Sequence, residues 1–178
     1  MKKILLAIIV AMTAVAANAQ FWIGGSFGLN FIKPDYSNSD VITSLTIAPE
    51  VGYKINDKWD VAVALNESFI ATDGDFYNSF SFEPYARYTF ANAGIASFFV
   101  DGGFGIGVTG FEGDDLFDNS RFNFYLGFRP GVNIALSQKV GMVAKLGFIG
   151  YEFVDDAYHT FGINLNNSPL TFGMYYNF

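Results

Sequence analysis

Eight charged side chains recur on one face of successive alternating segments, and balanced ion pairs are the chemistry that they could form. In these segments apolar residues alternate with small or polar ones. This period of two residues is typical of a β-strand that has one hydrophobic face. An unpaired buried ion costs several kcal/mol, so equal numbers of acids and bases predict a paired network in a confined interior. The four acids are Glu50, Asp60, Glu83 and Asp101, and the four bases are Lys54, Arg87, Arg129 and Lys145.

Two other groups of polar residues could bind a metal or catalyse a reaction. Acidic residues gather between the alternating segments, where their oxygens could hold Ca²⁺ or Mg²⁺, or bridge a divalent ion to lipopolysaccharide phosphates. The two densest acidic runs, residues 73–75 and 112–118, lack the spacing of an EF-hand loop. This favours acidic residues that are simply exposed to solvent at the rim of the fold. His159 is the single imidazole, and no zinc-binding spacing, nucleophile elbow or phosphate loop accompanies it. We therefore predict no catalytic residues, metal site or cofactor. The acids are Asp35, Asp40, Asp73, Asp75, Glu112, Asp114, Asp115, Asp118, Asp155 and Asp156.

The alternating segments are expected to position these residues as strands, because Gly, Asn, Asp and Pro clusters separate them. Tight turns alternate with longer acidic connections, which is the sidedness of an outer-membrane barrel. The sequence predicts an all-β fold, an eight-stranded antiparallel transmembrane β-barrel with up-and-down meander topology. The expected strands are 21–31, 44–55, 59–71, 79–90, 95–109, 121–136, 140–153 and 163–178, joined by short turns at 56–58, 91–94 and 137–139 and by long loops at 32–43, 72–78, 110–120 and 154–162.

The composition agrees with an exterior that faces lipid. The chain is 51% hydrophobic and 15% charged, with 21 Phe and 10 Tyr, a combination that soluble domains rarely show. A secreted soluble barrel or sandwich is the alternative, but the turn asymmetry and the period of two favour a membrane. The net charge of −7 leaves no basic stripe for nucleic acid. Aromatic girdles are expected from Trp22, Tyr53, Trp59, Tyr88, Phe90, Tyr176 and Phe178 at the short turns and from Phe31, Phe69, Phe80, Phe111 and Phe122 at the long loops.

The first 19 residues have the features of a secretory signal peptide. Lys2 and Lys3 precede an apolar stretch that is too short to span a bilayer as a helix, and Ala17-Asn18-Ala19 forms a small-residue cleavage site. We expect cleavage after Ala19, leaving residues 20–178 as one barrel domain without cysteine.

The interior of an eight-stranded barrel is just wide enough for side chains to fill it. The phase of the alternation points Tyr85, Tyr125, Tyr151 and Tyr175 inward, beside glycines that make room for them. Together with the balanced charges, these residues favour a plugged, ion-paired lumen over a conducting pore.

The hairpin of residues 48–59 (APEVGYKINDKW) and the ending of residues 175–178 (YYNF) resemble the outer-membrane-protein β-barrel family, which includes OmpA/OmpX-like eight-stranded barrels and many porin-family proteins. The resemblance covers essentially the whole expected mature chain and rests on patterns rather than signature residues. It implies residence in the outer membrane and insertion by the barrel-assembly machinery, which reads a terminal aromatic such as Phe178.

The expected role is therefore non-enzymatic: membrane structure, or surface interaction through acidic extracellular loops, in the outer membrane of a Gram-negative cell. A narrow pore for small solutes or ions is the alternative, and an enzyme dependent on His159 is a third class. The expected partners are outer-membrane lipid, lipopolysaccharide and the assembly machinery, with no nucleic acid. We expect a monomer, and the surface ligand is not specified by the sequence.

Overall fold

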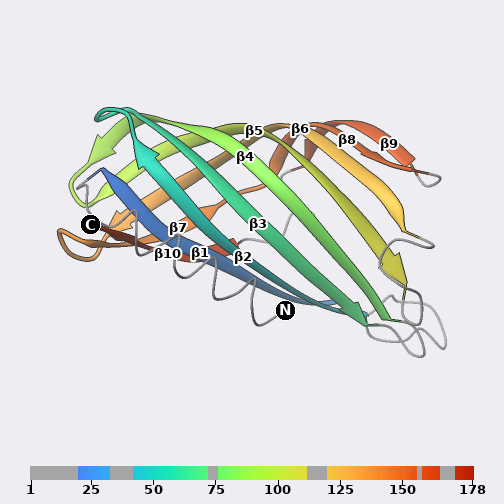
Figure 1. The fold of residues 1–178 in the computed structure, drawn as a ribbon. Helices are drawn as coiled ribbons and strands as arrows, with labels where there is room; N and C mark the ends of the chain where they lie inside the picture. The colour runs from blue at the N-terminus through green and yellow to red at the C-terminus, as the bar shows by residue number, and fades with distance from the viewer. Residues whose placement is uncertain (1–19, 33–41, 72–75, 112–119, 156–157, 165–170) are drawn as a thin grey trace.

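The computed structural model describes residues 20–32, 42–71, 76–111, 120–155, 158–164 and 171–178, and its strands wrap into a barrel (Figure 1). Neighbouring strands are antiparallel throughout the sheet. The strands are β1 (Phe21–Ile32), β2 (Ile42–Lys54), β3 (Trp59–Ala71), β4 (Phe76–Ala93), β5 (Ala96–Phe111), β6 (Arg121–Ala135), β7 (Val140–Lys145), β8 (Phe148–Val154), β9 (Tyr158–Asn164) and β10 (Thr171–Asn177).

These strands fill the eight positions of a closed barrel, as the sequence predicts. Strands β1 to β6 pair in chain order, β7 and β8 both pair with β6, and β9 and β10 pair with β8 and β7. The seventh and eighth positions of the barrel are therefore each filled by two strands. Pairing of β10 with β1, from Trp22 opposite Asn177 to Phe27 opposite Phe172, closes the barrel.

The seventh position was predicted as one continuous strand over 140–153, and this detail is wrong. A β-bulge interrupts it after Lys145 (Val140–Lys145 is β7). Gly131 pairs with Lys145 and Phe128 pairs with Ile149, so two residues of β6 face three of the interrupted strand. Gly147 in the bulge has φ of 61°, a conformation that glycine adopts without strain.

The last strand and its loop also differ from the prediction. The final position was expected as one strand over 163–178, but it consists of β9 and β10. The loop expected at 154–162 is shorter, because β8 runs to Val154 and β9 begins at Tyr158. His159 was expected in this loop and instead lies exposed in β9, opposite Phe153. Of the ten acids expected at the long connections, Asp155 is described, and it is exposed; the others lie outside the described residues.

One rim of the barrel, here called the short-turn rim, carries three tight turns and the C-terminal residue (Figure 1). The turn between β2 and β3 is closed by a hydrogen bond of 2.8 Å from Ile55 N to Trp59 O. Aromatic pairs gather near this rim, including Trp59 with Tyr88 at 4.7 Å and Tyr176 with Phe178 at 5.2 Å between ring centroids. Trp22 was expected in this girdle, but it points into the lumen and is 1% exposed.

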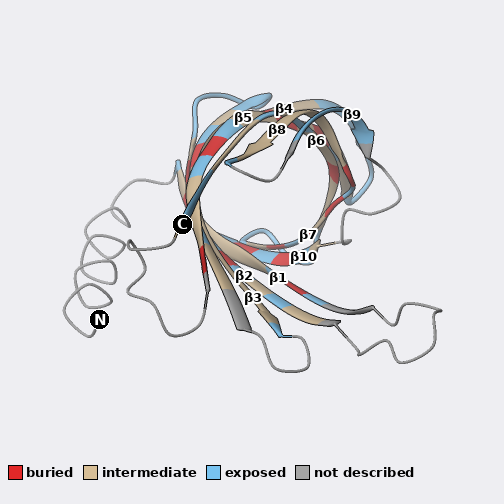
Figure 2. Cartoon of the chain, turned by 90° about the vertical axis from the view of Figure 1, so that its right-hand side faces the viewer, coloured by how far each residue is buried: buried red, intermediate tan, exposed pale blue. Residues whose placement is uncertain are grey.

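Burial is inverted relative to a soluble protein, because large apolar side chains are exposed and charged ones are buried. Figure 2 shows exposed and buried residues on the same strands of the barrel wall. Among the described residues, 25 large apolar side chains are exposed, whereas seven hydrophobic residues are buried. The exposed set covers the outside of most strands, and the buried set lies in the lumen with five charged residues. Such an exterior requires an apolar surrounding, because contiguous apolar surface of this extent is not tolerated in water. This agrees with the expected membrane location.

The apolar exterior predicts a depth-dependent cost of an outward charge. Leu126, in the middle part of β6, is 55% exposed, and Leu136, at a short turn, is 56% exposed. We expect Leu126→Arg to reduce the free energy of unfolding in lipid vesicles by about 2–4 kcal/mol, and Leu136→Arg by about 0–1 kcal/mol. Reversible urea unfolding of the protein in lipid vesicles measures both free energies. Equal effects of the two substitutions would contradict a hydrocarbon belt centred on the barrel wall.

Candidate functional site

The lumen holds the candidate site, a network of charged residues that we call the central ion cluster. It consists of Glu50 on β2, Arg87 on β4, Asp101 on β5 and Lys145 on β7, all buried. Each lies on the inward phase of its strand. Arg87 and Asp101 lie opposite each other on the neighbouring strands β4 and β5. Glu50 on β2 and Lys145 on β7 come from distant parts of the chain, and closure of the narrow barrel brings them to this pair.

The central ion cluster is closely paired. Arg87 donates from Nε and Nη2 to the two oxygens of Asp101, at 2.6 and 2.8 Å. Lys145 Nζ lies 2.9 Å from Glu50 Oε1 and 3.5 Å from Asp101 Oδ2, so it links the two acids. Tyr175 donates its hydroxyl to Glu50 Oε2 at 2.8 Å, and Tyr85 also donates to that oxygen. The carboxylate of Glu50 thus receives three donors, which offset its lost hydration.

Aromatic rings enclose the guanidinium of Arg87 on the short-turn side. Its Cζ atom lies 3.8 Å from the ring centroid of Phe99 and 5.1 Å from that of Tyr175. Trp22 stacks on Tyr175 with 4.5 Å between centroids, and Phe99 is 0% exposed. Cation–π attraction in this desolvated position adds to the salt bridge. The centre of the lumen therefore contains an aromatic layer beside the ion pairs.

A second ion pair lies on the other side of the central ion cluster. Arg129 on β6 bonds to Glu83 on β4, with 2.9 Å between Nη1 and Oε2. Glu83 also accepts from Ser81 Oγ at 2.8 Å and from Asn66 Nδ2 at 3.1 Å. The side chain of Arg129 is 31% exposed, against 6% for Arg87 and 10% for Lys145. This pair is therefore wetter than the central ion cluster.

The structure brings six of the eight predicted charges into these two groups. The other two, Lys54 and Asp60, face each other across β2 and β3 near the short-turn rim. Lys54 is exposed, whereas Asp60 is partly buried and also lies opposite Arg87 on β4. Asp60 thus borders the central ion cluster, and Lys54 lies at its outer margin.

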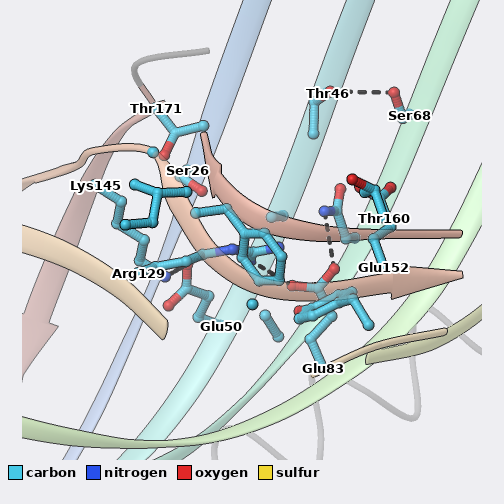
Figure 3. A pocket seen from close by; sticks show the side chains of 18 of the residues that line it. Ser26, Thr46, Glu50, Ser68, Glu83, Arg129, Lys145, Glu152, Thr160 and Thr171 are labelled. Carbon is cyan, nitrogen blue, oxygen red and sulfur yellow. Dashed lines mark hydrogen bonds and ion pairs between the residues drawn. The ribbon is translucent and has the colours of Figure 1, made fainter. Parts of the chain in front are cut away.

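The two ion-pair groups separate two cavities that have no lining residue in common. The inner cavity, about 410 Å³, lies at the short-turn rim and reaches Trp22, Arg87, Phe99 and Tyr175. The outer cavity, about 670 Å³, lies on the other side and reaches Glu50, Lys145, Glu83 and Arg129 (Figure 3). Between them lie the central ion cluster and its tyrosines, with a small cavity of about 20 Å³ beside Tyr85, Asp101 and Lys145.

Glu152 was not predicted as a lumen residue, and Tyr151 was predicted on the wrong face of its strand. A strict alternation from Lys145 points Tyr151 inward, but the bulge reverses the phase of β8. Tyr151 pairs with Leu126 on the outer surface, and Glu152 lines the outer cavity. Gly147 preceding an apolar segment is the available signal, since an isolated glycine inside a strand often marks a bulge.

The described residues contain no group of three or more His, Cys, Asp or Glu side chains arranged to hold a metal ion. Within the same ranges, no helix is long and apolar enough to cross a membrane.

Comparison with known proteins places this architecture in a family. No curated protein matches the sequence. Neisserial surface protein A superposes with a TM-score of 0.59 at 15% identity, over 90% of this chain and 98% of that one. The Yersinia pestis outer membrane protein Ail, whose backbone was determined in a phospholipid bilayer nanodisc, gives 0.53 at 16% identity, over 90% and 100%. These likenesses establish the fold, and OprG from Pseudomonas aeruginosa is more distant at 0.45, with 16% identity over 89% and 95%.

The family model described as "Outer membrane protein beta-barrel domain" matches residues 4–178, nearly the whole chain. Since the strands, the apolar exterior and the neighbouring structures all agree with that match, the chain belongs to the outer-membrane protein β-barrel family.

Proposed function

We propose that this protein is a non-enzymatic barrel with a plugged lumen, which serves membrane structure or surface interaction through its long connections. The observation that carries this proposal is the central ion cluster, in which Glu50, Lys145, Asp101 and Arg87 are buried and mutually paired. A permeation path would have to displace these charges, and each unpaired charge left behind is costly.

The orientation and partners proposed here follow from the same sidedness. Short turns face the periplasm in bacterial barrels, so the long connections face outward and meet lipopolysaccharide. Phe178 N donates to Phe21 O at 3.2 Å, which joins the last residue to the first strand. This position supports its role as the signal read by the barrel-assembly machinery. We further propose cleavage of a signal peptide after Ala19 and a monomeric barrel.

A narrow channel is the second candidate. The two cavities support it, because they extend from opposite sides toward the same ion-pair groups. Rearrangement of a few side chains would then join them. An enzyme that depends on His159 has less support, because this residue is exposed on β9 and no metal-binding group occurs among the described residues.

The plugged lumen predicts that the protein does not conduct ions across a bilayer. Purified wild-type protein in planar bilayers should give no stable single-channel steps, because the two cavities do not connect through the paired charges. Lys145→Ala combined with Tyr85→Ala removes bulk between the outer cavity, which Lys145 lines, and Arg87, which lines the inner cavity, and should produce steps. Heat-modifiable migration on a gel checks that both proteins are folded barrels. Stable steps from the wild type would favour the channel.

The different burial of the ion pairs predicts a ranking of stabilities. Glu50→Ala removes the acceptor of both tyrosines and the nearer of the two carboxylates at the buried Lys145, so we expect a loss of about 3–5 kcal/mol. Glu83→Ala should cost less, since Arg129 is partly hydrated. Asp155→Ala, at an exposed position, should cost within about 0.5 kcal/mol. Urea unfolding in vesicles measures this order, and an equal stability of the three variants would refute the paired plug.

A further inference from the structure

We propose that the outer cavity is a binding site for a short, neutral carbohydrate. Its volume of about 670 Å³ falls in the range of ~300–1,000 Å³ typical of small-molecule sites. The inference rests on the proposed function. If the central ion cluster plugs the lumen, the outer cavity is closed at its inner end and is not a section of a channel.

The lining favours a ligand that hydrogen-bonds on all sides. Most small-molecule pockets are predominantly apolar, whereas hydroxyl side chains surround this cavity on five strands. Two of them, Thr46 and Ser68, are bonded to each other at 3.1 Å between their oxygens (Figure 3). An apolar ligand would strip water from these groups without replacing its hydrogen bonds, which is costly. The hydroxyl residues are Ser26 on β1, Thr46 on β2, Ser68 on β3, Thr160 on β9 and Thr171 on β10.

The charges of the lining favour a neutral ligand. Glu50 is paired with Lys145 and Glu83 with Arg129, each at 2.9 Å. Glu152, the third acid of the lining, also has an interaction of its own. An ionic ligand would compete with these existing partners. A polyol instead donates to carboxylates and accepts from the guanidinium of Arg129 without carrying a charge.

Two aromatic rings of the lining position the guanidinium of Arg129. Tyr125 and Phe148 both line the cavity and meet edge to face, with 5.6 Å between centroids. The guanidinium of Arg129 lies over both rings, with Cζ 4.6 Å from the centroid of Tyr125 and 5.8 Å from that of Phe148, so the rings fix a donor group that a ligand hydroxyl would meet. A cyclic sugar loses less conformational freedom on binding than a linear polyol, which favours a carbohydrate as the neutral ligand.

The bulge after Lys145 creates the space for such a ligand. It turns Gly150 and Glu152 toward the lumen, where an unbroken strand would place Ile149 and Tyr151. Bulges next to binding sites commonly re-aim side chains in this way. A glycine therefore lines the cavity at a level that a bulky side chain would otherwise fill.

The experiment is a titration of the full barrel in detergent with maltose, lactose and cellobiose, each up to about 10 mM, enough to detect a Kd of about 1 mM. Calorimetry measures the affinity, and ¹³C-methyl spectra report on Thr46, Thr160 and Thr171. We expect at least one sugar to bind and to shift these methyl signals. Thr46→Val combined with Ser68→Ala should weaken binding about tenfold, because two hydrogen-bonding groups are lost together. Thr160→Val is a second variant, should the double variant fail to fold.

The matched control is Thr109→Val combined with Ser79→Ala. These residues also share a hydroxyl bond of 3.1 Å but do not line the outer cavity, so binding should be unchanged. Absence of binding by all three sugars, an equal loss in both double variants, or tighter binding of glucosamine or glucuronic acid than of the neutral sugars would overturn the inference. A barrel that conducts yet binds maltose would contradict the plugged lumen alone.

Discussion

The pairing of buried ions inside a narrow barrel is the constraint on which the rest of this structure depends. Hydration is largely lost in such a lumen, so each charge must find its counter-charge on another strand. Lys145 on β7 meets Glu50 on β2 and Asp101 on β5, which lie in different parts of the barrel wall. Arg87 and Asp101 pair across the neighbouring strands β4 and β5, but Glu50 obtains its cation only when the closed barrel brings Lys145 to it. Closure of the barrel is therefore required to neutralise the central ion cluster.

Small residues allow this network to fit. Gly105 on β5 lies beneath the ring of Tyr125, and a Cβ atom there would fall 2.1 Å from a carbon of that ring. Gly52 lies in the same way beneath Trp22, at 2.2 Å. Each large ring thus lies in the space that the glycine of the neighbouring strand leaves open, because glycine has no side chain. The glycines of the strands cost conformational entropy, and the packing of aromatic rings over them offsets that cost.

The sequence was sufficient to predict the fold class and the short turns. Of the eight charges predicted for the lumen, six lie in the two ion-pair groups, whereas Asp60 borders them and Lys54 is exposed. Period-two alternation is a local property, and it stays in register wherever strands pair without interruption, as in β2 to β5 near Glu50 and Asp101. It could not predict the bulge, which depends on how the seventh strand meets β6 at Arg129 and Pro130. One extra residue reverses every later side chain of that strand, and the errors at Tyr151 and Glu152 follow from it. A local pattern also could not predict which ions pair with each other, because the pairing depends on the register between strands that are distant in sequence.

The same bulge separates two regions of the lumen that differ in packing and polarity. Before it, β7 contributes Lys145 to the central ion cluster, where packing is tight and the ions are dry. After it, β8 contributes Gly150 and Glu152 to the outer cavity, where the wall is polar and the space is open. A continuous strand would carry one phase through both regions and fill the second with Ile149 and Tyr151. The interruption of the wall therefore separates the level of the ion pairs from the level of the outer cavity, and this chain places it directly after Lys145.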